Sequence, residues 1–211
     1  MSLKKRYAIV GIIIFMGQVI LIPLIKLLQG GVAPPVAVDK TKIKGLFSAP
    51  VWIQEFSDFQ CPACQKATEV MGGILKKNEG KIRVSFFHFP LRMHNWAMLA
   101  HHCAECAARQ GKFWEYHDLL YQRQSVWSAL ADPKETLKGY AKELSLNEKD
   151  FFLCLEDKTV TDRIAEDVKK GQELQVNSTP TFFVNNRRVI GGKTFEADMN
   201  KVIEEELKSG L

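Results

Sequence analysis

The sequence predicts an α/β domain in which two α/β halves flank a block of helices. Short runs rich in β-forming residues lie at 50–56 and 81–89 and in a hairpin at 181–190, with turn-forming residues around them. The stretch between the second run and the hairpin, about 94–175, has helical periodicity instead. Nothing suggests an internal repeat or two independent domains, so we expect one domain with a helical insertion.

Local signals set the limits of the individual elements. Pro62 is tolerated in the first turn of a helix, Gly111 breaks a helix, and Asn147 is a favourable N-cap. The pair Asn185-Asn186 forms the turn of the hairpin, between strands at 181–184 and 187–190. Helices are predicted at 61–78, 97–110, 113–124, 134–144, 147–155, 159–175 and 196–208.

The distribution of charge excludes a nucleic-acid partner. The chain has 29 Lys and Arg against 24 Asp and Glu, a formal net charge of +5. Four of the basic residues (Lys4, Lys5, Arg6 and Lys26) lie in the first 26 residues, which contain no acid. The remainder is close to neutral, whereas a nucleic-acid-binding domain carries a basic surplus on its folded part.

The N-terminal segment predicts export from the cytoplasm. Tyr7–Ile25 is apolar except for Gln18, and it is long enough to cross a hydrocarbon core of ~30 Å. A cleaved signal peptide is the alternative, but the run is long for one and no good cleavage site follows it. We therefore predict a single transmembrane helix at 1–28, a linker at 29–42 and a domain at 43–211. Either interpretation places the domain in an oxidising compartment, where cysteine pairs form disulfides.

A C-x-x-C pair marks the candidate active site. Cys61 and Cys64 lie where the first strand gives way to a helix. Unpaired N–H groups and the helix dipole favour an anion at this end, so Cys61 is the expected nucleophile. Cys64, one turn along, lies close enough to form a disulfide with it and to resolve a mixed disulfide. A structural disulfide or half of a zinc site is the alternative, but the strand-to-helix context favours redox chemistry.

Two features outside the pair support this interpretation. Glu55 lies in an otherwise apolar strand. If this were an edge strand, the carboxylate would face water. Beside the dithiol it would instead be desolvated, which would raise its pKa and allow it to relay the proton of Cys64. Thr179-Pro180 precedes the strand at 181–184. A proline at a strand start is usually an ordinary terminator, but a cis bond there would leave a backbone edge beside the cysteines for a substrate peptide.

Three motifs, in order, resemble the DsbA-type thiol:disulfide oxidoreductases: FSDFQCPAC (56–64), QGKFWEYHDLLY (110–121) and STPTFFVNNRRVIGG (178–192). The resemblance covers about 45–207 and is greatest to the membrane-anchored, BdbD-like branch. It implies a thioredoxin-like fold with a helical insertion, Cys61 as attacking and Cys64 as resolving cysteine, Pro180 as the cis-proline and Glu55 as the buried acid. One departure is Ala63, where many of these proteins have a histidine that helps to stabilise the thiolate.

The resemblance also implies a cellular role. The protein would form disulfides in exported cysteine-containing proteins at a bacterial inner membrane, with its catalytic domain on the periplasmic side. The redox-active disulfide would serve in place of a cofactor, and a quinone-linked membrane protein of the DsbB or VKOR type would reoxidise it. An isomerase or reductase would use the same residues, because the reduction potential decides the direction of exchange.

Three further cysteines leave alternatives open. Any two of Cys103, Cys106 and Cys154 can pair, or all three can be buried small side chains. The resemblance favours a Cys106–Cys154 staple. His101 and His102 share a helix with two of these cysteines, which permits a metal-binding protein on the same scaffold as the rival hypothesis. A binding module without activity is a third possibility, against which the intact CPAC argues.

Overall fold

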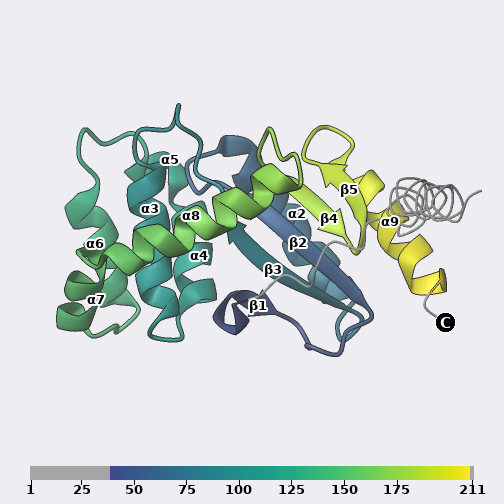
Figure 1. Ribbon diagram of the computed structural model, residues 1–211, viewed down its shortest axis with the longest axis horizontal. Helices are drawn as coiled ribbons and strands as arrows, with labels where there is room; N and C mark the ends of the chain where they lie inside the picture. Colours follow the sequence, from purple (N-terminus) through teal and green to yellow (C-terminus); the bar gives the residue numbers. More distant parts are fainter. Residues whose placement is uncertain (1–38, 210–211) are drawn as a thin grey trace, which may run out of the picture. The chain divides into compact units, whose positions relative to one another are not determined.

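The computed structural model describes residues 39–209, and the predicted anchor and most of the predicted linker lie outside this range. The described strands form one sheet in the order β1-β3-β2-β4-β5 (Figure 1). β2 and β3 are parallel, and the other neighbours are antiparallel. The strands are β1 Ile43–Lys44, β2 Val51–Ser57, β3 Ile82–His88, β4 Thr181–Val184 and β5 Arg187–Ile190.

Helices cover both faces of the sheet, as Figure 1 shows for α8 in front of it and α2 behind it. The insertion between β3 and α8 consists of α3 to α7, so the predicted α/β fold with inserted helices is confirmed. The helices are η1 Lys40–Lys42 (3-10), α2 Pro62–Lys77, α3 Ala97–Ala108, α4 Phe113–Gln122, α5 Gln124–Trp127, α6 Lys134–Glu143, α7 Glu148–Leu155, α8 Lys158–Glu173 and α9 Phe195–Ser209. Within residues 39–209, no helix has the length and apolar character that crossing a membrane requires.

The two faces of the sheet pack against different helices. On one face, Val51 and Ile53 of β2 pack with Met71 of α2 and Met199 of α9. On the other face, α8 approaches so closely that a Cβ atom on Gly171 would lie 2.6 Å from the ring of Phe89. A glycine is therefore required at this contact, and α8 is fixed against the sheet from which the active-site loop emerges.

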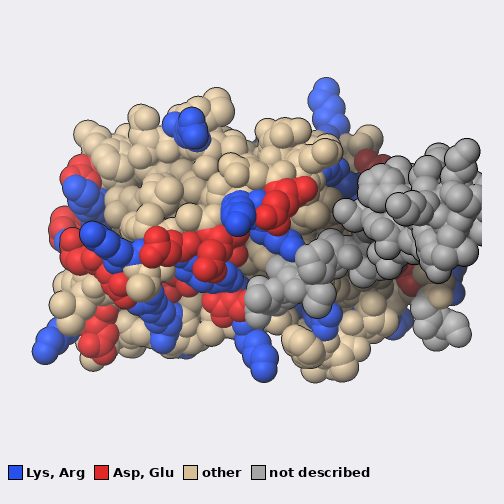
Figure 2. Space-filling model, viewed as in Figure 1, with Lys and Arg blue, Asp and Glu red and all other residues tan. Residues whose placement is uncertain are grey.

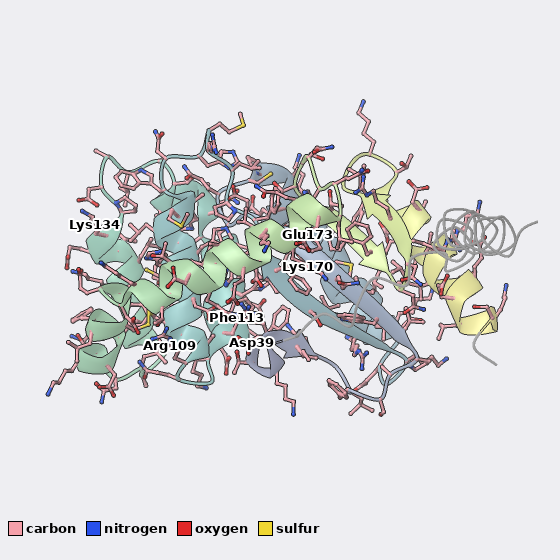
Figure 3. All side chains as sticks on the ribbon, viewed as in Figure 1. Asp39, Arg109, Phe113, Lys134, Lys170 and Glu173 are labelled. Atoms are coloured by element: carbon pink, nitrogen blue, oxygen red, sulfur yellow. A yellow bond between two sulfur atoms is a disulfide. The ribbon has the colours of Figure 1, made fainter. Side chains whose placement is uncertain are left out.

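The insertion has its own core and a disulfide. Tyr116, Trp127 and Phe151 are fully buried in it. The disulfide joins Cys106 of α3 to Cys154 of α7, and Figure 3 shows its sulfur atoms beside Arg109. The pairing that the resemblance favours is thus confirmed, and Cys103 is a buried free thiol.

The N-terminal part of the domain differs from the prediction. Residues 40–44 form η1 and β1, although 29–42 were expected to be a linker. Lys42 is 1% exposed, and its Nζ lies 3.0 Å from Glu105 Oε2 and 3.1 Å from Asp167 Oδ2. His88 Nε2 lies 3.0 Å from the same Glu105 oxygen. Lys42 thus neutralises two buried carboxylates of α3 and α8, and this contact fixes a segment that has no periodic pattern of its own.

A second difference lies at the end of α4. The predicted helix 113–124 divides into α4 and α5 at Arg123, whose backbone leaves helical geometry (φ −110°, ψ 20°). The division turns Gln124 toward the active-site loop, where its side-chain amide donates to the carbonyl oxygens of Phe59 (2.7 Å) and Cys61 (3.0 Å). The break therefore connects the insertion to the loop before α2.

The surface carries charges of both signs. Figure 2 shows acidic and basic side chains intermixed in a band over α8 and the insertion, with no large area of one sign on this face. This mixture agrees with the near-neutral composition after residue 26 and gives no electrostatic site for nucleic acid on the face that is shown.

Candidate active site

Cys61 occupies the N-cap of α2, and Pro62 is the first helical residue. The Cys61 side chain is buried, and the pKa of its thiol is lowered to about 5. The main cause is the hydrogen bond from the Cys64 thiol, which outweighs burial; Thr179 and the backbone N–H groups of Cys64 and Ala63 contribute further. The helix end thus stabilises a Cys61 thiolate without an imidazole at position 63.

The pKa of the Cys64 thiol is shifted in the opposite direction. It is fully buried, and burial raises its pKa well above the ordinary value, with the negative charge of Cys61 acting in the same direction. The backbone N–H of Asp58 lies 3.5 Å from its sulfur. At neutral pH, Cys61 is therefore the nucleophile and the better leaving group, whereas Cys64 keeps its proton.

The loop before β4 completes the exposed side of the pair. The Thr179-Pro180 peptide bond is cis, as predicted, and the carbonyl oxygen of Thr179 lies 3.6 Å from Cys61 Sγ. Gly191 packs on Pro180: its N–H donates to the proline carbonyl at 3.0 Å, and a Cβ atom there would lie 2.5 Å from the proline ring. Gly191 thus allows the close seating of Pro180 beside the nucleophile.

Glu55 lies behind the pair. β2 is a central strand, paired with β3 and β4, so the alternative of a solvated edge-strand acid is wrong. The side chain is 3% exposed, and burial raises its pKa, partly offset by His117 and by the hydroxyl of Ser57. Ser57 also contacts Cys64, so one hydroxyl neighbours both the acid and the resolving thiol.

Several residues of the site carry no signal of their own in the sequence. Tyr121 bonds to the Ser57 hydroxyl at 2.9 Å and to the Asp58 carbonyl at 3.3 Å. The Asp58 carboxylate accepts from Leu91 N–H at 2.7 Å and lies 2.8 Å from His94 Nδ1. Tyr121 belongs to one of the resemblance motifs, but only the fold brings it to the cysteines from a distance of about sixty residues.

The rival metal site is not assembled. Cys106 is bonded to Cys154, and His101 faces His88 with 2.6 Å between their Nδ1 atoms. Across residues 39–209, no group of three or more His, Cys, Asp or Glu side chains has the geometry to hold a metal ion. The cysteines and histidines of α3 instead pack within the protein.

Comparisons with known proteins agree with this architecture. A family profile described as thioredoxin matches residues 38–205. The chain belongs to the thioredoxin family. Among solved structures, α-DsbA1 of Wolbachia pipientis has a TM-score of 0.69 and 23% identity, covering 80% of this chain and 92% of that one. BdbD of Bacillus subtilis, in oxidised form, has a TM-score of 0.70 and 24% identity over 79% and 92% of the two chains.

These structures show that this member of the thioredoxin family has the DsbA-like form of the fold, with its helical insertion. A periplasmic thioredoxin-like protein from Salmonella enterica serovar Typhimurium shares it at a TM-score of 0.65 and 16% identity, over 79% of this chain and 89% of that one. In this fold, the Cys61 and Cys64 thiols lie beside a cis-proline.

Curated relatives share the domain but are much longer. "Na(+)/H(+) antiporter NhaA 1" of Salinispora arenicola is 40% identical over 164 residues, which is 77% of this chain and 24% of that protein. "Na(+)/H(+) antiporter NhaA 3" of Salinispora tropica is 38% identical with the same coverage. The chain thus spans about a quarter of these relatives, and their names describe those proteins.

Proposed function

We propose that the protein is an export-side thiol:disulfide oxidase, which forms disulfides in exported proteins through the Cys61–Cys64 pair. The opposite shifts of the two thiol pKa values carry this proposal. A stabilised Cys61 thiolate favours the reduced pair, so the oxidised pair readily accepts electrons from a substrate. The environment of Cys61 thus supports the oxidising direction of exchange.

The reaction proceeds through a mixed disulfide. A substrate thiolate attacks Cys61 Sγ of the oxidised pair, the bond to Cys64 breaks, and Cys64 leaves as a thiolate that takes up a proton. A second substrate thiolate then attacks the substrate sulfur of the mixed disulfide, and Cys61 leaves as a thiolate. The substrate loses two electrons, which the pair gains.

The surroundings of the pair suit these steps. The Thr179 carbonyl beside Cys61 can accept a backbone hydrogen bond from an extended substrate peptide, which would hold the substrate cysteine at the nucleophile. Behind the pair, Glu55 can supply the proton that Cys64 takes up, because its raised pKa keeps it protonated to a higher pH than an ordinary carboxyl group.

The N-terminal sequence and the chemistry support a cellular setting for this reaction. The apolar run in residues 1–28 would anchor the protein in a bacterial inner membrane, with residues 43–211 on the periplasmic side. The pair itself would be the only redox centre, without a cofactor. A quinone-linked membrane protein of the DsbB or VKOR type would remove the two electrons that each cycle leaves on the pair.

The direct test follows disulfide transfer from the oxidised full chain, in detergent, to a reduced two-cysteine peptide. Wild type should oxidise the peptide, and Cys61→Ser and Cys64→Ser, which cannot form the active-site disulfide, should not. Given oxidised glutathione, Cys64→Ser should instead keep glutathione attached to Cys61 as a mixed disulfide, because it has no resolving thiol. Cys103→Ala is the matched control, because this buried thiol lies outside the pair, and it should transfer like wild type. Full activity of Cys61→Ser would overturn the assignment.

A further inference from the structure

A pocket of about 260 Å³ lies behind the active site, between α2 and α4. Its wall includes three polar side-chain atoms that are buried and have no hydrogen-bond partner among the described residues: Glu55 Oε1, His117 Nε2 and Trp114 Nε1. Met71 and Leu75 of α2 supply part of its apolar lining. An acid, an imidazole and an indole thus share one cavity with their polar atoms unpaired.

Unpaired buried polar atoms around a cavity of this size indicate water. Leaving such an atom without a partner is unfavourable, and a pocket with several polar groups is the kind that holds ordered water. A bridge of one or more water molecules between Glu55 and His117 would satisfy both side chains. The pocket then connects two titratable groups that make no direct bond.

The inner end of this connection reaches the cysteines. Glu55 and Ser57 lie two residues apart on β2 and therefore on the same face of the sheet. The Ser57 hydroxyl neighbours both Glu55 and Cys64, and Tyr121 bonds to the same hydroxyl at 2.9 Å. In the inference below, this hydroxyl would be the path for a proton between Cys64 and Glu55.

The outer end reaches solvent. The His117 side chain is 3% exposed, and its Nδ1 lies 2.8 Å from Asp118 Oδ1, whose side chain is 41% exposed. Lys44 of β1 lies 3.5 Å from the other Asp118 oxygen, and Glu69 of α2 lines the same pocket. His117 thus has one ring nitrogen, Nε2, that is buried without a partner, and the other, Nδ1, beside a carboxylate at the surface.

We propose that His117 carries the proton between Glu55 and solvent, through water in this pocket, whenever Cys64 changes its protonation state. The proposal rests on the proposed function, since it concerns the same dithiol. An imidazole can accept a proton at one nitrogen and release one from the other near neutral pH, which suits it for this step.

The step balances in the direction that oxidises the pair. With glutathione attached to Cys61, the Cys64 thiol gives its proton to the Glu55 carboxylate. The Cys64 thiolate attacks Cys61 Sγ, and glutathione leaves as a thiolate with the electron pair of the broken bond. Glu55 passes the proton through water to His117, which releases a proton to solvent beside Asp118. In the opposite direction, the proton travels inward to the Cys64 thiolate.

The reaction of the reduced protein with oxidised glutathione separates this step from the rest. The first step, attack of the Cys61 thiolate on glutathione disulfide, needs no proton from Cys64 and is an internal control. The second step, ring closure by Cys64, requires that Cys64 lose its proton. His117→Ala should slow ring closure at least about tenfold, within the range of general acid–base catalysis, and leave the first step unchanged.

Added imidazole identifies the role of the side chain. Imidazole fits the space that His117→Ala vacates and should restore ring closure, which a merely structural loss would not allow. Because His117 packs among aromatic rings, His117→Gln is the second variant; it keeps the volume and a polar group but cannot shuttle a proton, so it should also be slow. His102→Ala is the matched control, since this histidine of α3 bonds to Thr161, away from the pocket.

A double variant tests whether the two groups form one path. If Glu55 and His117 act in series, Glu55→Gln should slow ring closure, and adding His117→Gln should slow it no further. Wild-type rates of ring closure in both His117 variants would overturn the inference and leave the proposed function intact. Failure of wild type to form the mixed disulfide at all would instead overturn the proposed function.

Discussion

The ionisation of Cys61 should make the stability of the reduced protein depend on pH in a defined window. The pKa of this thiol is about 5 in the folded protein, against an ordinary value of 9.0. Because the folded value is the lower one, the contribution to stability is fully present above about pH 9 and disappears as the pH falls through about 5. In the oxidised protein the disulfide does not titrate, so the difference between the two forms isolates the effect.

The magnitude follows from the shift. At pH 7 the folded state lies about two pH units above its thiol pKa, and each unit corresponds to about 1.36 kcal/mol, so the reduced form should gain about 2.7 kcal/mol relative to pH 4. Cys64 does not enter this window, because its raised pKa affects stability only where an ordinary thiol ionises, at about pH 9 and above.

Urea unfolding of the reduced and the oxidised protein between pH 4 and pH 7.5 measures this difference. The free energy of unfolding of the reduced form should rise relative to that of the oxidised form, with most of the change between pH 5 and 7. Cys61→Ser, which has no thiolate, should follow the profile of the oxidised wild type. A difference that stays constant with pH would refute the account of the Cys61 environment.

Three other predictions concern the scaffold. Gly191→Ala places a Cβ atom 2.5 Å from the Pro180 ring. It should clearly slow disulfide exchange, measured by peptide oxidation, while the melting temperature in thermal unfolding changes little. Replacing Cys106 and Cys154 by Ala together should cost about 4 kcal/mol in urea unfolding, from the 48-residue separation that the disulfide closes, and leave the reduction potential of the active-site pair unchanged. Lys42→Met removes the lysine that bridges the buried carboxylates of Glu105 and Asp167, of which Asp167 keeps Arg163 as a partner, so unfolding should show a loss of about 3–5 kcal/mol at pH 7 and a smaller loss at low pH.

The sequence predicted the parts of the site that local patterns encode. The CPAC pair between a strand and a helix indicates a thiol at a helix N-terminus, and the resemblance implies the cis bond at Thr179-Pro180 that the structure has. Glu55 stands out because an acid interrupts an apolar strand. Each of these residues can be recognised from its immediate neighbours in the chain, although its chemistry also depends on the fold.

The parts of the fold and the site that the sequence did not predict depend on contacts between distant segments. Lys42 is buried because its ammonium group binds the carboxylates of Glu105 and Asp167, which lie 63 and 125 residues away in the chain. No periodic pattern in residues 39–44 predicts that this lysine is buried. Gln124 faces the active-site loop only because the helix breaks at Arg123. From the sequence alone, Lys42 and Gln124 cannot be distinguished from ordinary polar surface residues.

The reduction potential of the Cys61–Cys64 pair, measured against glutathione buffers, tests the central claim most directly. Stabilising the reduced state by about 2.7 kcal/mol at pH 7 raises the potential by about 60 mV relative to a pair with ordinary thiols. We expect a value in the oxidising range, about −120 to −180 mV. A value near −270 mV, typical of a reductase, would contradict the assignment as an oxidase.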